Sequence, residues 1–182
     1  MGMAAPLYYT ADMVQALPAD GNKYETVYGE LLVTPAARMW HQVVIQRLFQ
    51  IIDPYAQQHD LGKTFCLPAD ISWGDDVLVQ PDLFVADSEQ VRALDWSKVK
   101  TMKLVAEVVS PSSTRYDRFT KRKLYQTVGV QTYCVVDPDR HEAEVWTPDS
   151  ITPQVHRDRL VWAPPESTKP LAIDLGDLFR PI

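Results

Sequence analysis

The spacing of hydrophobic and polar residues changes between helical and strand-like periods along the chain, which is typical of an α/β protein. A long helix is predicted from about residue 37 to residue 58, because apolar side chains recur there at helical intervals. Pro54 lies inside this segment and should kink or weaken its last turns. A short helix is predicted over 11–17, with Thr10 as its N-cap and Pro18 at its end.

Runs of alternating or β-branched residues predict strands in much of the remaining chain. Residues 24–33 predict two strands joined by a turn, and residues 132–146 predict a hairpin. Further strands are expected at 64–67 and 70–73. The C-terminal part, 155–179, contains two short strand-like runs whose place in the fold the pattern does not determine.

The middle of the chain predicts two strands followed by a helix. Residues 77–85 predict a strand that contains Pro81, and a proline there indicates an edge position or a bulge. Residues 104–109 predict a buried strand, and 117–128 predict a helix that ends at Gly129. Together the elements predict an α/β (α+β) fold in which a central mixed β-sheet is flanked by helices.

Length and charge limit the classes of protein to consider. With 182 residues, the chain is expected to form a single domain over 1–182. Its net charge of −6 argues against a protein that coats nucleic acid through bulk electrostatics. Residues 91–130 nevertheless carry nine Lys or Arg against three acidic residues, so this segment could contact phosphates locally. An ordinary solvated helix face would explain the same lysines.

The sequence also suggests where the protein is found. No apolar run is long enough to cross a bilayer, and the first residues lack the pattern of a secretory signal. Cys66 and Cys134 both lie in strand-like runs and are expected to be buried free thiols of an intracellular protein. We therefore expect a cytoplasmic protein that does not associate with membranes.

One acidic residue stands out in the buried strand. Glu107 lies in an otherwise apolar run, on the face shared by Val105 and Val109. Burying a carboxylate is unfavourable unless it is paired, hydrogen-bonded or bound to a metal. An edge strand with one charge at its tip would be the ordinary explanation.

A lysine is equally unusual in the helix that follows. Lys121 occupies the first position of an apolar stripe that continues through Leu124, Tyr125 and Val128. It could extend its ammonium to the surface, or pair with Asp117 one turn earlier. The strand that carries Glu107 directly precedes this helix, which favours a role beside that carboxylate.

Two carboxylates and a lysine suit the hydrolysis of a phosphodiester. If Asp82 and Glu107 lie on neighbouring strands, their oxygens suit Mg²⁺ or Mn²⁺. Such an ion can bind a phosphate oxygen and activate water, while Lys121 orients that water or offsets developing charge. The predicted catalytic residues are therefore Asp82, Glu107 and Lys121.

Four motifs in order carry a family resemblance. They are Pro81-Asp82, then Ala106-Glu107-Val108-Val109-Ser110-Pro111-Ser112, then Asp117-x-x-x-Lys121-x-x-x-Tyr125, then Gly129-Val130-x-x-Tyr133-x-Val135-Val136-Asp137-Pro138. Upstream, Tyr24-Glu25, Gly29-Glu30 and His41 match as well. Over residues 10–150 the sequence resembles a large bacterial family of putative restriction endonucleases, a branch of the PD-(D/E)XK nuclease superfamily.

The resemblance implies roles for individual residues. It makes Asp82 and Glu107 the metal ligands, with the backbone carbonyl of Val108 as a further oxygen. The superfamily's usual lysine position holds Val109 here, and the resemblance implies that Lys121 on the next helix replaces it. Asp117 would orient that lysine or reach the metal through water.

Other residues keep two interpretations. Glu30 either assists the metal site or is a surface strand residue, and His41 is either catalytic or structural at the start of its helix. Ser110 and Ser112 either contact phosphate or form the turn that leads into the next helix.

The leading hypothesis is a Mg²⁺- or Mn²⁺-dependent endonuclease that cleaves DNA. An alternative is a catalytically inert protein with the nuclease fold that binds nucleic acid or regulates, which Val109 and the acidic surface favour. A third hypothesis is a hydrolase of other phosphoesters or nucleotides. A homodimer is possible, because two sites would cut two strands more easily.

Overall fold

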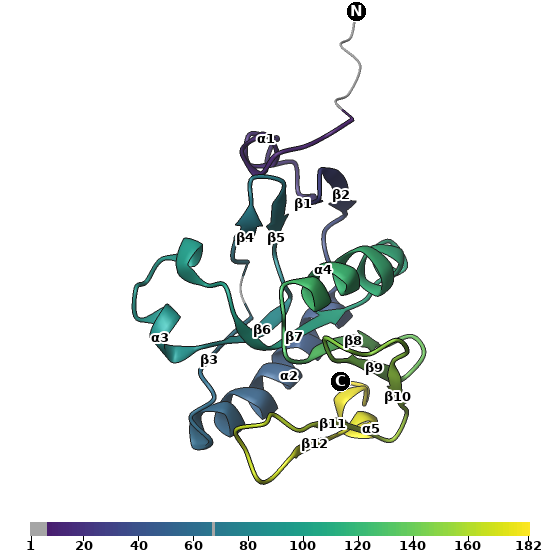
Figure 1. Cartoon of the computed structure of the whole chain (residues 1–182). Helices are drawn as coiled ribbons and strands as arrows, with labels where there is room; N and C mark the ends of the chain where they lie inside the picture. Colours follow the sequence, from purple (N-terminus) through teal and green to yellow (C-terminus); the bar gives the residue numbers. More distant parts are fainter. Residues whose placement is uncertain (1–6, 67) are drawn as a thin grey trace, which may run out of the picture.

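The computed structural model describes residues 7–66 and 68–182, which form three β-sheets and several helices (Figure 1). The helices are α1 (Ala11–Gln15), α2 (Met39–Gln58), α3 (Ser88–Val91), η1 (Trp96–Lys98), η2 (Tyr116–Lys121), α4 (Arg122–Thr127) and α5 (Leu175–Leu178). The strands are β1 (Lys23–Val27), β2 (Glu30–Thr34), β3 (Lys63–Phe65), β4 (Ile71–Gly74), β5 (Val77–Val79), β6 (Leu83–Ala86), β7 (Met102–Val108), β8 (Tyr133–Asp137), β9 (Glu142–Trp146), β10 (Gln154–His156), β11 (Arg159–Trp162) and β12 (Leu171–Asp174).

The largest sheet has six strands in the order β10-β9-β8-β7-β6-β3. Strands β7 and β8 run parallel, and the other neighbours run antiparallel, so the sheet is mixed. The crossover between the parallel strands contains η2 and α4, as a parallel connection requires. The predicted mixed sheet flanked by helices is confirmed.

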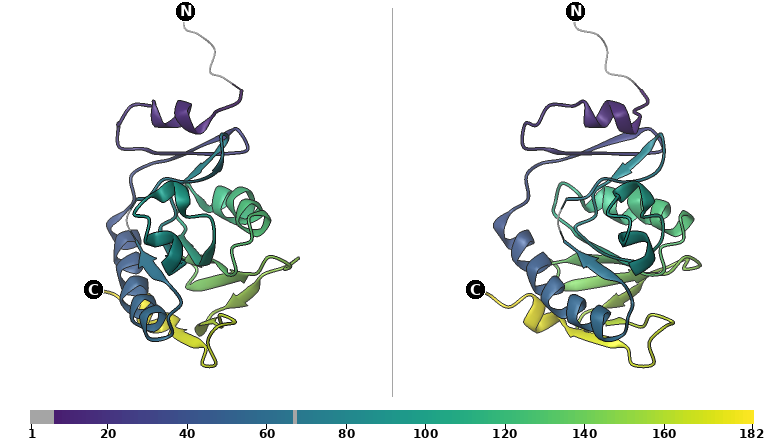
Figure 2. Two further views of the ribbon diagram at one scale, coloured as in Figure 1. Left: turned by 60° about the vertical axis from the view of Figure 1, so that its left-hand side comes forward. Right: turned by 90° about the vertical axis from the view of Figure 1, so that its left-hand side faces the viewer.

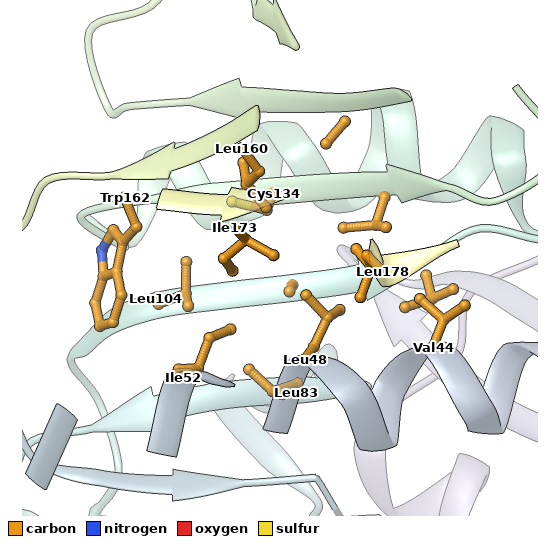
Figure 3. Packing of buried hydrophobic residues seen from close by; sticks show 14 of the residues in the cluster. Val44, Leu48, Ile52, Leu83, Leu104, Cys134, Leu160, Trp162, Ile173 and Leu178 are labelled. Atoms are coloured by element: carbon orange, nitrogen blue, oxygen red, sulfur yellow. The ribbon is translucent and has the colours of Figure 1, made fainter. Parts of the chain in front are cut away.

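Helix α2 and the C-terminal elements cover one face of this sheet. Figure 3 shows Val44, Leu48 and Ile52 of α2 pointing toward Leu83 and Leu104 of the sheet. Helix α2 also contacts β12 and α5, which lie beside it in both views of Figure 2. The C-terminal strands, whose place the sequence pattern left open, therefore complete this core: β11 and β12 form a two-stranded sheet of their own.

Helix α4 covers the opposite face of the sheet. Its Leu124 and Tyr125 are fully buried and pack with Val105 and Tyr133 on β7 and β8. Successive residues of a strand point to opposite faces, so Glu107 lies on the α4 side together with Val105. The predicted face of Glu107 is confirmed.

A four-stranded sheet, in the order β2-β1-β5-β4, lies at the end of the molecule where α1 packs (Figure 1). The chain passes from this sheet to the larger one between Val79 and Leu83. The prediction of one strand over 77–85, with Pro81 at an edge or a bulge, was therefore wrong: Pro81 lies between β5 and β6, and each of these strands has neighbours on both sides. Pro81 lacks an N–H to donate, and the sheets separate at this residue.

The remaining elements agree closely with the predictions. Thr10 caps α1 through the N–H of Met13, at 3.3 Å. Helix α2 continues past Pro54 to Gln58. The predicted strand over 64–67 is found as β3, although position 67 lies outside the described residues.

The helix predicted over 117–128 begins with a π-helical turn, η2, before it becomes α-helical. Both cysteines are free thiols, as predicted. The prediction that both are buried was wrong for Cys66, which is only partly buried, whereas Cys134 is buried. Among residues 7–66 and 68–182, no helix is long and apolar enough to span a membrane.

Candidate active site

Strand register brings the two predicted carboxylates together. Leu83 at the start of β6 pairs with Ala106 on β7, and the strands are antiparallel. One residue further along, the same register sets Asp82 beside Glu107. The sheet therefore joins two acids that are far apart in the sequence.

Asp82 is held by donors from three elements. Its Oδ2 atom accepts a hydrogen bond from the N–H of Val108 at 3.0 Å and lies 3.1 Å from Nε2 of His41. Its Oδ1 atom lies 3.4 Å from Nζ of Lys23. Burial opposes ionisation, but the Lys23 ammonium and the His41 hydrogen bond lower the pKa of Asp82 below its usual range. Asp82 is therefore a carboxylate with a fixed orientation.

Glu107 is buried against the helix that follows its strand. Its Oε1 atom accepts hydrogen bonds from Nζ of Lys121 at 3.2 Å and from the hydroxyl of Tyr125 at 3.1 Å. Burial raises the pKa of Glu107 to about 8; the Lys121 charge opposes the rise, and Asp82 adds to it. Burial therefore favours the protonated form of Glu107, whereas the Lys121 ammonium favours its carboxylate.

Lys121 lies at the centre of a cluster of carboxylates. Its Nζ atom is 2.9 Å from Oε2 of Glu25 and 3.4 Å from Oδ1 of Asp117, in addition to the contact with Glu107. Only 2% of its side chain is exposed. Burial would lower the pKa of Lys121, but Glu107, Glu25 and Asp117 together raise it well above its usual value. Lys121 is therefore a permanent cation here and not a proton acceptor.

The π-helical turn η2 supplies two members of this cluster. Asp117 and Lys121 both belong to it, and both are buried. The hydroxyl of Tyr133 donates to the backbone carbonyl of Asp117 at 2.9 Å, which fixes the turn to β8. Within this turn Asp117 pairs with Lys121, as expected if it orients that lysine.

Glu25 was missed as a site residue by the sequence analysis, which named Glu30 instead. Glu25 is fully buried on β1, and its Oε1 atom accepts the N–H of Gln80 at 2.7 Å. Glu30, by contrast, is exposed at the start of the edge strand β2 and lies 3.5 Å from Thr120 Oγ1. Glu30 therefore has the place of a surface strand residue, one of its two interpretations, because β2 pairs with β1 on one side only and its other edge is open.

Lys23 was also missed, and it too lies on β1. Its Nζ atom contacts Asp82 and donates to the backbone carbonyl of Gln80 at 3.2 Å. Burial and Lys121 oppose its charge, but Glu25 and Asp82 raise the pKa of Lys23 to about 12. Alternation along β1 gave the signal, because Lys23 and Glu25 share one face of the strand.

A cavity of about 740 Å³ opens in front of Asp82 and Glu107. Lys23, His41, Val108 and Asp117 also line it, whereas Lys121 and Glu25 lie behind its wall. Ser110 and Ser112 reach the cavity too, and their hydroxyls lie 2.9 Å apart in the turn before η2. The two serines therefore form the predicted turn, and this turn lies at the cavity wall, where their hydroxyls could also contact a phosphate.

The basic segment 91–130 presents fewer free charges than its composition suggests. Arg118 pairs with Asp137 at 2.8 Å and with Glu144 at 2.7 Å. Lys103 pairs with Glu166, and Lys121 is buried in the cluster described above. Three of the nine basic residues of this segment are thus paired with acids inside the protein.

Within the described residues, no group of three or more His, Cys, Asp or Glu side chains is arranged to hold a metal ion. The predicted ligand set has only two such side chains, Asp82 and Glu107, and its third donor is the backbone carbonyl of Val108. Its donors are all oxygens, as hard divalent cations prefer.

Comparisons with known proteins identify the family and the fold of the chain. The sequence profile of the Uma2 family, described as "Putative restriction endonuclease", matches residues 11–175. The chain belongs to the Uma2 family. No curated protein matches it.

A solved structure is also similar to this Uma2 protein. It is a putative nuclease belonging to DUF820 from Anabaena variabilis ATCC 29413, with a TM-score of 0.74 and 22% sequence identity. The match covers 94% of this chain and 97% of the other. The fold is therefore restriction-endonuclease-like, as the sequence motifs predicted.

Proposed function

We propose that this Uma2 protein is a divalent-metal-dependent endonuclease that hydrolyses phosphodiester bonds of DNA. The observation that supports the proposal best is the meeting of Asp82 and Glu107 at the wall of one cavity, with the Lys121 ammonium directly behind Glu107. In the reaction, the oxygen of water bonds to phosphorus and the water gives up a proton. The bond from phosphorus to the leaving oxygen breaks, and that oxygen takes up a proton.

The donor set fits Mg²⁺ or Mn²⁺. Both hydrogen bonds to Glu107 use Oε1, and Oδ1 of Asp82 contacts only Lys23 among the described residues, so each carboxylate retains acceptor capacity. The four site carboxylates exceed the two lysines by two negative charges when all are ionised, which one divalent ion would balance. Asp82, Glu107 and the Val108 carbonyl would hold this ion, which would polarise a phosphate oxygen and acidify a water molecule.

The protein's own residues orient these donors. His41 and the N–H of Val108 fix Asp82, while Lys121 and Tyr125 fix Glu107. Such hydrogen bonds hold ligands in the orientation that a metal requires. In the proposed site, His41 orients Asp82, which is the structural one of its two interpretations.

The enclosure of Lys121 favours a second candidate function. Its ammonium is buried among three carboxylates, and Val109 occupies the usual lysine position, so an inert nuclease-fold protein that binds nucleic acid is the alternative. This candidate predicts binding without metal-dependent cleavage.

A cleavage assay tests the proposal. Purified wild-type protein is incubated with plasmid DNA and Mg²⁺ or Mn²⁺, beside Asp82→Asn, Glu107→Gln and the matched control Glu30→Gln. Wild type and Glu30→Gln should cleave, while the other two should fall to background. Cleavage that survives both site substitutions would place the activity elsewhere, and DNA binding without cleavage would favour the alternative.

Substrate class is tested with the same proteins. RNA, single-stranded oligonucleotides and small phosphate esters are offered in parallel with plasmid DNA. A preference for the small ester would identify a phosphoesterase of another kind.

A further inference from the structure

Two lysines lie beside the site carboxylates, and they face different surroundings. Lys121 is 2% exposed, and three carboxylates surround its ammonium. It does not line the cavity within the described part of the chain. A substrate in the cavity would therefore meet Glu107 and Asp117 before it could reach Lys121.

Lys23 lies on the cavity side of the same carboxylates. A quarter of its side chain is exposed, and it lines the cavity together with Asp82 and Glu107. Its ammonium is 3.4 Å from Oδ1 of Asp82 and 3.2 Å from the carbonyl of Gln80. Oε2 of Glu25 lies 3.9 Å away, beyond hydrogen-bond distance. An ammonium has three donors, so its third N–H can turn to a ligand in the cavity.

Strand β1, which carries Lys23, also fixes the position of the segment that leads from β5 to β6. The Glu25 carboxylate accepts a hydrogen bond from the backbone N–H of Gln80, and the Lys23 ammonium donates one to the backbone carbonyl of Gln80. Both backbone groups of Gln80 are therefore bound by side chains of β1. Asp82 follows two residues later. Lys23 is thus held beside Asp82 by the packing of the two sheets, and not by a mobile loop.

We infer that Lys23 contacts the reacting phosphate group of the substrate, and that Lys121 is a positioning residue which orients Glu107, Glu25 and Asp117. The inference rests on the proposed function. An ammonium at this place donates to a phosphate oxygen and offsets the negative charge that builds during hydrolysis. No proton is transferred to or from Lys23 in this role.

The first test compares Lys23→Gln and Lys23→Arg with Lys63→Gln, which removes an exposed lysine of β3 outside the cavity. Binding of a labelled oligonucleotide is measured by fluorescence anisotropy against salt concentration, without divalent ions. For Lys23→Gln, the slope of log affinity against log salt should become shallower by about one. Lys23→Arg should recover the slope, and Lys63→Gln should match wild type.

Cleavage kinetics separate a role of Lys23 in the reaction from a role in substrate binding alone. Lys23→Gln should lower kcat by roughly 10²- to 10³-fold, as expected for a group that stabilises charge in the transition state, with a smaller change in KM. Wild-type kcat and salt slope in Lys23→Gln would overturn the inference while leaving the nuclease proposal intact. Weaker binding by Lys23→Gln in a protein that never cleaves DNA would support the contact and reject the nuclease.

A footprint on the wild-type protein does not depend on any variant folding. Lysines are acetylated with and without an oligonucleotide, and the products are located by mass spectrometry. Lys23 should react and be protected by DNA, Lys63 should react in both cases, and Lys121 should react in neither. Equal reaction of Lys23 with and without bound DNA would overturn the inference.

Discussion

The ammonium of Lys121 lies 2.9 Å from Oε2 of Glu25, although the first residue belongs to η2 and the second to β1. The pair joins the four-stranded sheet to the helix that covers the six-stranded sheet. Both side chains are almost completely buried, so this contact lies in an environment of low dielectric constant. It connects the fold to the candidate site.

Replacing Lys121 by glutamine should lower the free energy of unfolding by about 3–5 kcal/mol, because three buried carboxylates would lose their common cation. Urea denaturation of the two proteins measures the change. Lys123→Gln, which removes an exposed lysine of α4, is the matched control and should change stability little. A loss as small as the control's would show that the carboxylates do not depend on Lys121.

Metal affinity should depend on pH through Glu107. Burial raises its pKa to about 8, and a metal ligand must be deprotonated, so affinity should rise by about tenfold per pH unit below that value. Titration of Mn²⁺ by calorimetry at several pH values measures this slope. Above about pH 8 the curve should level off. A flat profile from acid to neutral pH would exclude Glu107 as a ligand that titrates with binding.

Stability without metal should also depend on pH through the same group. Its pKa is higher in the folded protein than the ordinary 4.5, so the folded state binds more protons between about 4.5 and 8. The contribution of Glu107 to stability therefore falls as pH rises through this window. Glu107→Gln removes this contribution, so its stability relative to wild type should improve from about pH 5.5 to about pH 8 in urea denaturation. A relative stability that falls over this range would contradict the raised pKa.

His41 should affect metal binding through Asp82. His41→Ala removes the partner 3.1 Å from Oδ2, which leaves Asp82 less well oriented and should weaken Mn²⁺ binding roughly 10- to 100-fold. His59→Ala is the comparison, since His59 lies outside the cavity lining. Unchanged affinity in His41→Ala would limit this histidine to packing.

Two glycines should differ in their tolerance of alanine. Gly129 ends the helix at φ +78° with open space around a Cβ, so Gly129→Ala should cost only the backbone strain, about 1–2 kcal/mol. A Cβ on Gly62, at φ +133°, would lie 2.0 Å from the carbonyl oxygen of Ala86. Gly62→Ala should therefore cost clearly more, and thermal unfolding of both variants checks the order.

Local patterns were enough to predict most elements of the fold. Helix α2, the 132–146 hairpin and strand β7 have spacings that tertiary contacts merely stabilise. The division of 77–85 into two strands was not predictable, because it depends on which sheet each half joins. The contact of Lys121 in η2 with Glu25 on β1 was likewise not predictable, because it depends on how the two sheets pack.

The sequence by itself determined that Asp82, Glu107 and Lys121 are unusual, because a charge in an apolar strand or stripe must find a partner. Only the tertiary structure decided which partners they have. Glu25 and Glu30 belong to the same hairpin, but pairing of β1 on both sides buries the first, and the open edge of β2 exposes the second. Burial depends on neighbours that are distant in the chain, and so does the chemistry of a charged side chain.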